Sequence, residues 1–167
     1  MPAAFMFTKQ KREKNYVALA GTMHKEIHAD HLRIVDPYTD PNVWAIVDDG
    51  CNASCHSDKW IHNAMSKWKA KGFTPRQLNC KATRFSGVGQ KTTDGQFQIP
   101  MGLKLLESGM RIPGVMKSYQ IGDSEHPLLI SQSVQAMLGF VKDVRNGIIT
   151  MTDYGGQNLE VVRLVSS

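Results

Sequence analysis

Short apolar runs, interrupted every few residues by turn-forming positions, predict that strands dominate this chain. VWAIV at 43–47 is a continuous apolar run rich in β-formers, which is typical of a buried strand. PYTDPN at 37–42 precedes it, and its two prolines together with Asp40 and Asn42 predict a turn. HPLLIS at 126–131 is a second short apolar run and predicts another buried strand.

One segment, 57–71, has the periodicity of a surface helix with a single apolar face. Ser57 or Asp58 can cap its N-terminus, and Gly72 is a natural stop. A second, shorter helix is predicted near 132–138. The apolar positions of the first helix recur at i, i+4 and i+8: Trp60, Ile61, Ala64, Met65 and Trp68.

The second half of the chain has turn residues at β-like intervals. The segments 82–90 and 95–103 flank the turn-prone TTDG and predict a glycine-hinged hairpin. MRIPGVMKSYQIG at 110–122 predicts one or two further strands. FVKDV and IITMT flank Asn146-Gly147 and predict another hairpin, because Asn-Gly accepts the positive φ angles of a type I′ turn. NLEVVRLV predicts a strand near the end of the sequence.

Length and composition are those of an ordinary globular domain. The chain has 167 residues, 41% apolar and 21% charged, which is enough to bury a core in one domain. No stretch approaches the roughly 18 apolar residues that a membrane-spanning helix needs. The apolar patch near the N-terminus is too short for a secretory signal, and Glu13 fits an organelle transit peptide poorly. We therefore expect no membrane span and take an intracellular location as the default.

A basic cluster near the N-terminus contributes to the net charge of +5. Such a cluster can contact nucleic acid or anionic lipid, or it can form a solvated arm. A protein that binds single-stranded nucleic acid needs aromatic residues between the basic ones, and this cluster has none. We therefore predict a basic arm and do not expect nucleic acid as a partner. The cluster consists of Lys9, Lys11, Arg12 and Lys14.

The three cysteines, Cys51, Cys55 and Cys80, are an odd number and argue against a full disulfide framework. Together with His56 and His62 they could supply zinc ligands, since thiolate and imidazole are the usual donors. The spacing Cys-x3-Cys-His lacks the paired Cys-x2-Cys of strong zinc modules. The alternative is that small buried cysteines pack beside the preceding loop. We predict no metal and no cofactor.

Two adjacent carboxylates, Asp48 and Asp49, come directly after the apolar run at 43–47 and precede Gly50. Carboxylates next to a buried strand are costly unless they are paired, protonated or used in chemistry. The purely structural interpretation is that they are helix-capping or turn residues ahead of Gly50, because turns often contain Asp-Gly. The functional interpretation depends on two motifs that lie further along the chain.

Three blocks in order resemble the retropepsins, the retroviral and retrotransposon-type aspartic proteases. The family has an apolar-apolar-Asp-Thr/Ser-Gly block, then a flap, then an apolar strand with Leu-Leu-Gly at a short helix. Here Ile46-Val47-Asp48-Asp49-Gly50 matches the first block. The flap's leading strand is matched by Phe85-Ser86-Gly87-Val88-Gly89, and the last block by Pro127-Leu128-Leu129-Ile130-Ser131 with Ala136-Met137-Leu138-Gly139.

The resemblance implies a mostly-β fold, a closed barrel or sandwich equivalent to half of an acid protease. It covers about 43–165, so we divide the chain into an N-terminal arm with extra strands at 1–40 and a retropepsin-like domain at 41–167. The helix at 57–71 would be peripheral to this domain. No internal repeat supplies a second half.

The activity implied by the resemblance is peptide-bond hydrolysis by a homodimer with one Asp48 from each subunit. Asp153-Tyr154-Gly155 lies in a polar turn and is a poor second site, so two copies are needed. Residues 85–97 would cover a peptide or polyprotein substrate. The substrate-binding candidates in this flap are Ser86, Gly87, Val88 and Gly89.

Position 49 departs from the family pattern. The family has a Ser or Thr there, whose hydroxyl donates a hydrogen bond across the dimer axis, whereas an ionised Asp49 only accepts hydrogen bonds. A working site requires Asp49 to be protonated in place or turned outward. The alternative function is a catalytically inactive domain of the same fold, acting as a binding or structural subunit of a larger assembly.

Overall fold

The structure is a computed structural model that describes residues 31–78, 84–87 and 89–165, with only the backbone described at 84–87 and 89–92. The basic arm, Cys80 and Val88 lie outside these residues. The strands are β1 (Ile34–Val35), β2 (Ala45–Val47), β3 (Cys55–Ser57), β4 (Arg76–Leu78), β5 (Arg84–Gly87), β6 (Gly89–Thr92), β7 (Gln96–Lys104), β8 (Arg111–Ile121), β9 (Leu128–Ile130), β10 (Phe140–Asp143), β11 (Ile148–Met151), β12 (Gln157–Asn158) and β13 (Arg163–Leu164). The helices are α1 (Asp58–Trp68) and α2 (Gln132–Met137), with 3-10 turns η3 (Lys69–Lys71) and η4 (Thr152–Tyr154).

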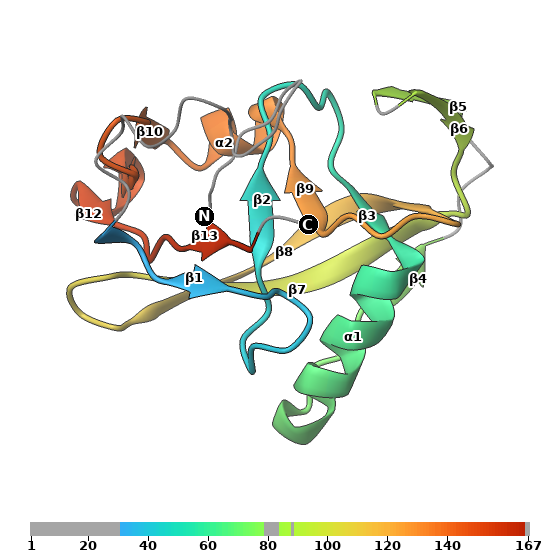
Figure 1. Cartoon of the computed structure of the whole chain (residues 1–167), viewed down its shortest axis with the longest axis horizontal. Coiled ribbons are helices and arrows are strands. Elements are labelled where there is room, and N and C mark those ends of the chain that lie inside the picture. Colours follow the sequence, from blue (N-terminus) through green and yellow to red (C-terminus); the bar gives the residue numbers. More distant parts are fainter. Residues whose placement is uncertain (1–30, 79–83, 88, 166–167) are drawn as a thin grey trace.

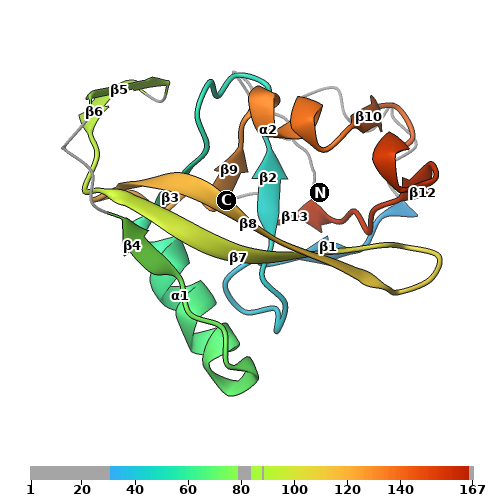
Figure 2. The same ribbon diagram turned by 180° about the vertical axis from the view of Figure 1, so that it is seen from behind.

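The fold is mostly β, as predicted, and its main sheet has the strand order β2-β9-β3-β8-β7-β4. Within it, β2 runs parallel to β9 and β3 runs parallel to β8. Among the described strands this sheet is open, with β2 and β4 at its edges. Smaller sheets are formed by β10-β11-β12, by β5-β6 and by β1-β13. Figures 1 and 2 show the long β7–β8 hairpin crossing the molecule, with α1 below it and β5–β6 above it.

The peripheral helix is confirmed as α1, and its apolar face is the one that the sequence predicts. The Ser57 hydroxyl caps it by accepting the Trp60 N–H at 3.0 Å. Met65 is the exception on the predicted face and is 41% exposed. None of the helices in the described part of the chain is long and apolar enough to cross a membrane. The buried face packs on β7 and β9 through one cluster: Trp60, Ile61, Ala64, Trp68, Ile99, Leu128 and Ile130.

The predicted buried strand and short helix at 126–138 are confirmed as β9 and α2. All three residues of β9 are buried, and Ser131 caps α2 by accepting the Val134 N–H at 3.5 Å. The chain leaves the helix through Gly139, whose φ is +69°. A side chain at Gly139 would meet Thr152 and Asp153, so glycine is required there for space as well as for backbone conformation.

The predicted hairpin between 82–90 and 95–103 is wrong. β5, which lies within the first segment, pairs with β6, and β7 pairs instead with β8 from Gln96↔Tyr119 to Lys104↔Arg111. TTDG does not turn the chain back on itself, because the Asp94 N–H donates to Gln120 O at 2.8 Å and begins the β7–β8 ladder. Pairing with a long strand makes many more backbone hydrogen bonds than a local hairpin could.

The hairpin formed by β10 and β11 is confirmed, but its turn is not type I′. Only Gly147, with a φ of +66°, has a positive φ there, so Asn146 does not adopt the required angle. The loop is four residues long, and the Asp143 carboxylate holds it by accepting the Asn146 N–H at 3.1 Å and the Asn146 amide at 2.6 Å. This side-chain contact stabilises a turn that the Asn-Gly pair alone does not specify.

A strand of the N-terminal segment and a strand near the end of the chain pair with each other. In β1 and β13, Ile34 lies opposite Arg163 and Val35 opposite Leu164, in parallel. The single strand predicted from NLEVVRLV is divided between β12 and β13. The division of the chain at position 40 stays a prediction. The β1–β13 pairing crosses this boundary, because β1 precedes position 40 and β13 follows it.

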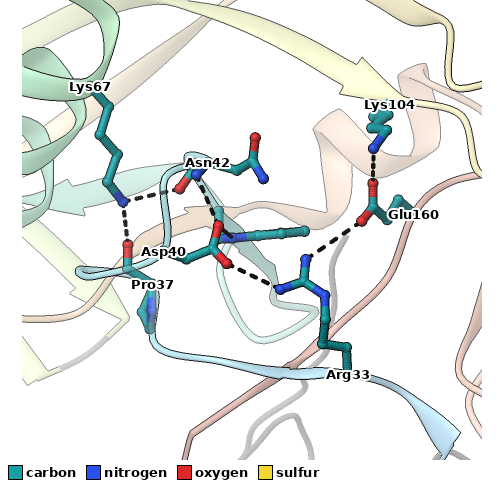
Figure 3. A network of polar contacts seen from close by, with 8 residues as sticks. Arg33, Pro37, Asp40, Asn42, Lys67, Lys104 and Glu160 are labelled. Carbon is teal, nitrogen blue, oxygen red and sulfur yellow. Dashed lines mark hydrogen bonds and ion pairs between the residues drawn. The ribbon is translucent and has the colours of Figure 1, made fainter.

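A polar network around Asp40 ties the predicted turn at 37–42 to the rest of the fold (Figure 3). The Asp40 carboxylate accepts the Asn42 N–H at 2.9 Å and the Trp44 indole N–H at 3.0 Å. Arg33 bonds the same carboxylate at 3.1 Å and reaches Glu160 at 3.7 Å. The turn is therefore connected to the C-terminal segment through a single arginine.

The same turn is also anchored to α1. The Lys67 ammonium donates to the backbone oxygens of Pro37 at 2.8 Å and Asn42 at 3.0 Å (Figure 3). Burial lowers the pKa of Lys67, against the opposing field of Asp40 and the neighbouring acidic residue of the turn. These contacts hold the segment that leads into β2 and hence the loop that follows β2.

Candidate active site

Asp48 is placed by the pairing of β2 with β9. Its N–H donates to Ile130 O at 3.1 Å, which extends the parallel ladder by one residue beyond Val47. Its carboxylate turns back toward its own loop and accepts the Gly50 N–H at 2.9 Å. The side chain is half-buried at the end of the strand. A carboxylate with a fixed backbone and partial access to water is suited to proton transfer.

Gly50 lets the loop close tightly around this carboxylate. A β-carbon at Gly50 would lie 3.3 Å from Asp48 Oδ1, closer than an ordinary contact. The Cys51 N–H donates to Asp48 O at 3.4 Å and completes the turn. Glycine after the two aspartates therefore leaves room for this close approach without a shift of the Asp48 side chain.

Lys142 explains why two carboxylates can stand side by side. Its ammonium, on β10, bonds Asp49 Oδ1 and also donates to Gln135 Oε1 at 2.9 Å. The Asp49 side chain is 52% exposed and that of Lys142 is 17% exposed. The charge of the half-exposed Asp49 is therefore paired with a cation of the same chain.

Gln135 links this ion pair to the backbone that positions Asp48. It is buried in α2, and its side-chain N–H donates to Ile130 O at 3.0 Å. Ile130 O is the same oxygen that accepts the Asp48 N–H. Lys142, Gln135 and Ile130 O thus form a continuous path between the side chain of Asp49 and the main chain of Asp48.

Sequence reasoning missed Lys142, because the strand pattern around it is inverted. In FVKDV an apolar residue would be expected to face inward and a lysine outward, yet Val141 is exposed and Lys142 is largely covered. Burial lowers the pKa of Lys142, while its hydrogen bond to Asp49 and the negative charges of Asp49 and Asp48 oppose that shift. Nothing in the local sequence signals this partner.

Lys142→Met is expected to lower the free energy of unfolding by about 1 kcal/mol. The charged hydrogen bond to the buried Gln135 is lost, while the half-exposed Asp49 stays hydrated and so contributes less. Urea denaturation near neutral pH measures the change. Lys117→Met, at an exposed position of β8, is the matched control and is expected to change stability by less than about 0.5 kcal/mol. Equal losses in both variants would contradict a structural role for the Lys142 network.

The residues weighed as zinc ligands do not come together. Cys51 and Cys55 are buried free thiols with their sulfurs 3.8 Å apart, in the same small cluster as Ile121 and Leu129. His56 follows Cys55 along β3, so it points to the other face of the sheet, where it contacts Ser118 at 2.8 Å. Within the described ranges, no three His, Cys, Asp or Glu side chains could hold a metal ion.

His56 lies in the core between Trp60 and Phe97, with ring centroids 5.8 and 5.5 Å away. Burial lowers its pKa to about 4, against smaller opposing effects of Gln120 and Asp58. The folded protein therefore excludes a proton that the unfolded chain binds below about pH 6.5. The free energy of unfolding is expected to be greatest above that pH and to fall as the pH drops toward 4.

The cost to folding from His56 alone is expected to reach about 3 kcal/mol between about pH 7 and pH 4. His56→Gln removes the titrating group and should make stability less dependent on pH in this range. Denaturant unfolding at both ends of the range measures this. His62→Gln, on the exposed side of α1, should behave like wild type. Identical pH dependence in the two variants would contradict a buried neutral His56.

The predicted flap forms a separate hairpin. Ser86 and Gly87 lie on β5 and Gly89 lies on β6, with Gly87 opposite Gly89; Val88 lies outside the described residues. Figures 1 and 2 show the hairpin on the same side of β7–β8 as the loop after β2. Its covering of a substrate stays a prediction.

Comparison with known proteins finds similarity among solved structures. No family model matches the chain, and no curated protein matches it. Among solved structures, the chain is similar to the crystal structure of the retroviral protease-like domain of Ddi1 from Leishmania major, with 20% identity and a TM-score of 0.41. The similarity covers 69% of this chain and 80% of that one.

Proposed function

We propose that the chain is an aspartic endopeptidase that hydrolyses peptide bonds through a homodimeric pair of Asp48 side chains. The observation that supports this most is the separation of roles between adjacent carboxylates. Asp49 is paired with Lys142, whereas Asp48 is held half-buried at the end of β2 by the backbone of its own loop. This arrangement keeps the charge of Asp49 from adding in full to that of the proposed dyad.

In the proposed mechanism, the two Asp48 carboxyl groups of the dimer share one proton, because like charges so close cannot both ionise. The ionised carboxylate removes a proton from a water molecule, whose oxygen attacks the carbonyl carbon of the peptide bond. The protonated carboxyl group donates to the developing oxyanion. Proton transfer to the amide nitrogen then allows the C–N bond to break and yields a new carboxyl and a new amine.

Within one subunit, the hydrogen bonds of Lys142 stabilise the loop that carries Asp48 and Asp49. In the family that the sequence resembles, a Ser or Thr hydroxyl bonds across the dimer axis. Asp49 cannot donate in that way, but Lys142 donates to both Asp49 and Gln135 from its own subunit. The loop is thus stiffened through α2 and β10, and the missing hydroxyl does not by itself exclude activity.

The proposed substrate is a peptide or polyprotein segment in extended conformation. The flap residues Ser86, Gly87, Val88 and Gly89 would offer backbone hydrogen bonds to it, as an added strand does. Glycines in the hairpin would allow the movement that admits the substrate. The resemblance to the retropepsins implies a peptide or protein substrate and no cofactor.

Two measurements on the unmodified protein test the proposal. Cleavage of an unfolded protein mixture is followed by mass spectrometry from about pH 3 to pH 7, the range in which carboxyl dyads titrate. Light scattering under the same conditions gives the mass in solution. Peptide cleavage together with a dimer mass supports the proposal. Since His56 is expected to weaken folding in acid, each pH point includes a measurement of folded protein.

The second candidate is a catalytically inactive domain that acts as a binding or structural subunit of a larger assembly. The observation that favours it is Asp49 itself, a carboxylate where the related proteases have a hydroxyl. A protein that stays monomeric cannot assemble the Asp48 pair. If the protein is a folded monomer and cleaves no peptide over the whole pH range, the inactive-domain proposal therefore replaces the enzyme proposal.

A further inference from the structure

Two buried thiols lie directly behind the loop that carries Asp48. Cys51 follows Gly50, and Cys55 is the first residue of β3. Their sulfurs are 3.8 Å apart, and both are reduced. Their contact allows a covalent bond to form next to the candidate active site.

Cys55 is the fixed member of the pair. It lies opposite Tyr119 of β8 and Leu129 of β9, so strands hold it on both sides. Cys51 lies in the loop instead, and its Sγ donates to Ala53 O at 2.9 Å. Joining the sulfurs requires the 3.8 Å separation to close by about 1.8 Å, to the S–S length of about 2.05 Å. Most of that movement must come from Cys51.

The backbone of Cys51 connects this movement to the candidate catalytic residue. Its N–H donates to Asp48 O at 3.4 Å, and its carbonyl accepts the Gln132 N–H at 3.3 Å. A bond that displaces the backbone of Cys51 would therefore shift or release both the Asp48 loop and the start of α2. A misplacement of about 1 Å in a catalytic group can reduce turnover by about a hundredfold.

We propose that Cys51 and Cys55 form a reversible disulfide that controls the position of the Asp48 loop. The oxidant is a small-molecule disulfide. The thiolate of one cysteine attacks it, forming a mixed disulfide and releasing one small thiol. The thiolate of the other cysteine then attacks the protein sulfur of the mixed disulfide and releases the second small thiol. Two electrons pass to the oxidant, and the two protons lost by the protein end on the released thiols.

The reaction is expected to be slow in the folded protein. Contact with Cys51 and burial raise the pKa of the Cys55 thiol, so little of it is thiolate near neutral pH. Both residues are also covered, which limits access by the oxidant to moments when the loop opens. The rate of oxidation should therefore rise with pH, and a thiol reductant should reverse the bond.

The positions of the trypsin cleavage sites make a Cys51–Cys55 disulfide easy to identify by mass. Trypsin cuts after Arg33 and after Lys59, so a single peptide, 34–59, contains both Cys51 and Cys55. The third cysteine, Cys80, falls in the separate peptide 77–81. An internal bond lowers the mass of peptide 34–59 by two hydrogens, whereas a bond to Cys80 joins the two peptides.

The test incubates the folded wild-type protein with oxidised glutathione, blocks the remaining thiols and analyses the tryptic peptides. We expect peptide 34–59 to lose two hydrogens and to regain them with dithiothreitol. Cys80→Ser should behave the same, and Cys51→Ser should abolish the change. Persistence of both free thiols in wild type, accumulation of mixed disulfides only, or a peptide joined to Cys80 would overturn the proposal.

Control of activity by this bond rests on the proposed endopeptidase function and is measured separately. Oxidation should reduce peptide cleavage at least tenfold, and reduction should restore it. Unchanged cleavage by fully oxidised protein would overturn the control of the loop. If the reduced protein cleaves nothing, the endopeptidase proposal fails, while the mass of peptide 34–59 still decides whether the disulfide forms.

Discussion

Asp48→Asn is expected to reduce peptide cleavage by at least about a thousandfold. Asparagine has nearly the same shape and can still accept the Gly50 N–H through its carbonyl oxygen, so the loop keeps its conformation. It cannot take a proton from water or share one with a second carboxyl group. General acid–base catalysis by a positioned side chain contributes about a hundred- to ten-thousandfold, and here one substitution removes both members of the dyad.

Asp123→Asn is the matched control for this substitution. Asp123 is exposed, and its φ of +52° is one that asparagine also adopts readily. Its cleavage rate should equal that of wild type. Thermal unfolding of both variants verifies that they are folded. If folded Asp48→Asn cleaves peptides at more than a tenth of the wild-type rate, Asp48 is not the catalytic group.

Trp60→Ala is expected to lower the free energy of unfolding by about 3–5 kcal/mol, the usual cost of removing a large buried aromatic side chain. Trp60 is 2% exposed, and its ring packs edge-on to Trp68 with centroids 6.1 Å apart. Its indole N–H donates to Trp44 O at 2.9 Å. The substitution therefore leaves a cavity and removes the partner of a backbone oxygen just ahead of β2.

Urea denaturation near neutral pH measures this loss, with Met65→Ala as the control on the same helix. Met65 is on the exposed edge of the apolar face, so its truncation should cost less than about 1 kcal/mol. Similar losses in the two variants would show that the helix does not pack as described. Trp60→Phe should lie between them, because it retains the ring contact and loses the hydrogen bond.

This core matters for the candidate site because α1 packs on β9. Leu128 and Ile130 of that strand face the helix, and Ile130 O accepts both the Asp48 N–H and the Gln135 amide. Weaker packing of α1 on β9 should therefore alter the position of Ile130 O and, with it, the Asp48 loop. The folded fraction of Trp60→Ala is expected to lose peptidase activity as well as stability.

Local patterns were sufficient to predict several elements of the fold. The apolar repeat from Trp60 to Trp68, with Ser57 or Asp58 as its cap, identifies α1. The apolar run at 126–131 and the short helix expected near 132–138 correspond to β9 and α2. These signals depend on neighbours a few residues apart in the chain. The Asp-Asp-Gly sequence was likewise recognisable as a carboxylate loop after an apolar strand, although only Val47 of that strand, β2, is buried.

The partners of these elements could not be predicted in the same way. The choice of β8 over β5 as the partner of β7 depends on the total number of backbone hydrogen bonds that each pairing makes, and local turn residues do not report that number. The β10–β11 turn was misjudged because the Asp143 side chain, rather than the Asn-Gly pair, sets its conformation. Both errors arise where a tertiary or side-chain contact outweighs local propensity.

The sequence by itself determined which residues could do chemistry: a carboxylate at the end of a strand, a glycine beside it and cysteines behind it. Only the tertiary structure decided how they are paired, because Lys142 lies 93 positions from Asp49 and is turned inward against the strand pattern. The contact of Cys51 with Cys55 likewise depends on how β3 is held between β8 and β9. Charge pairing and thiol contact are set by distances in space, and the order of residues along the chain does not contain them.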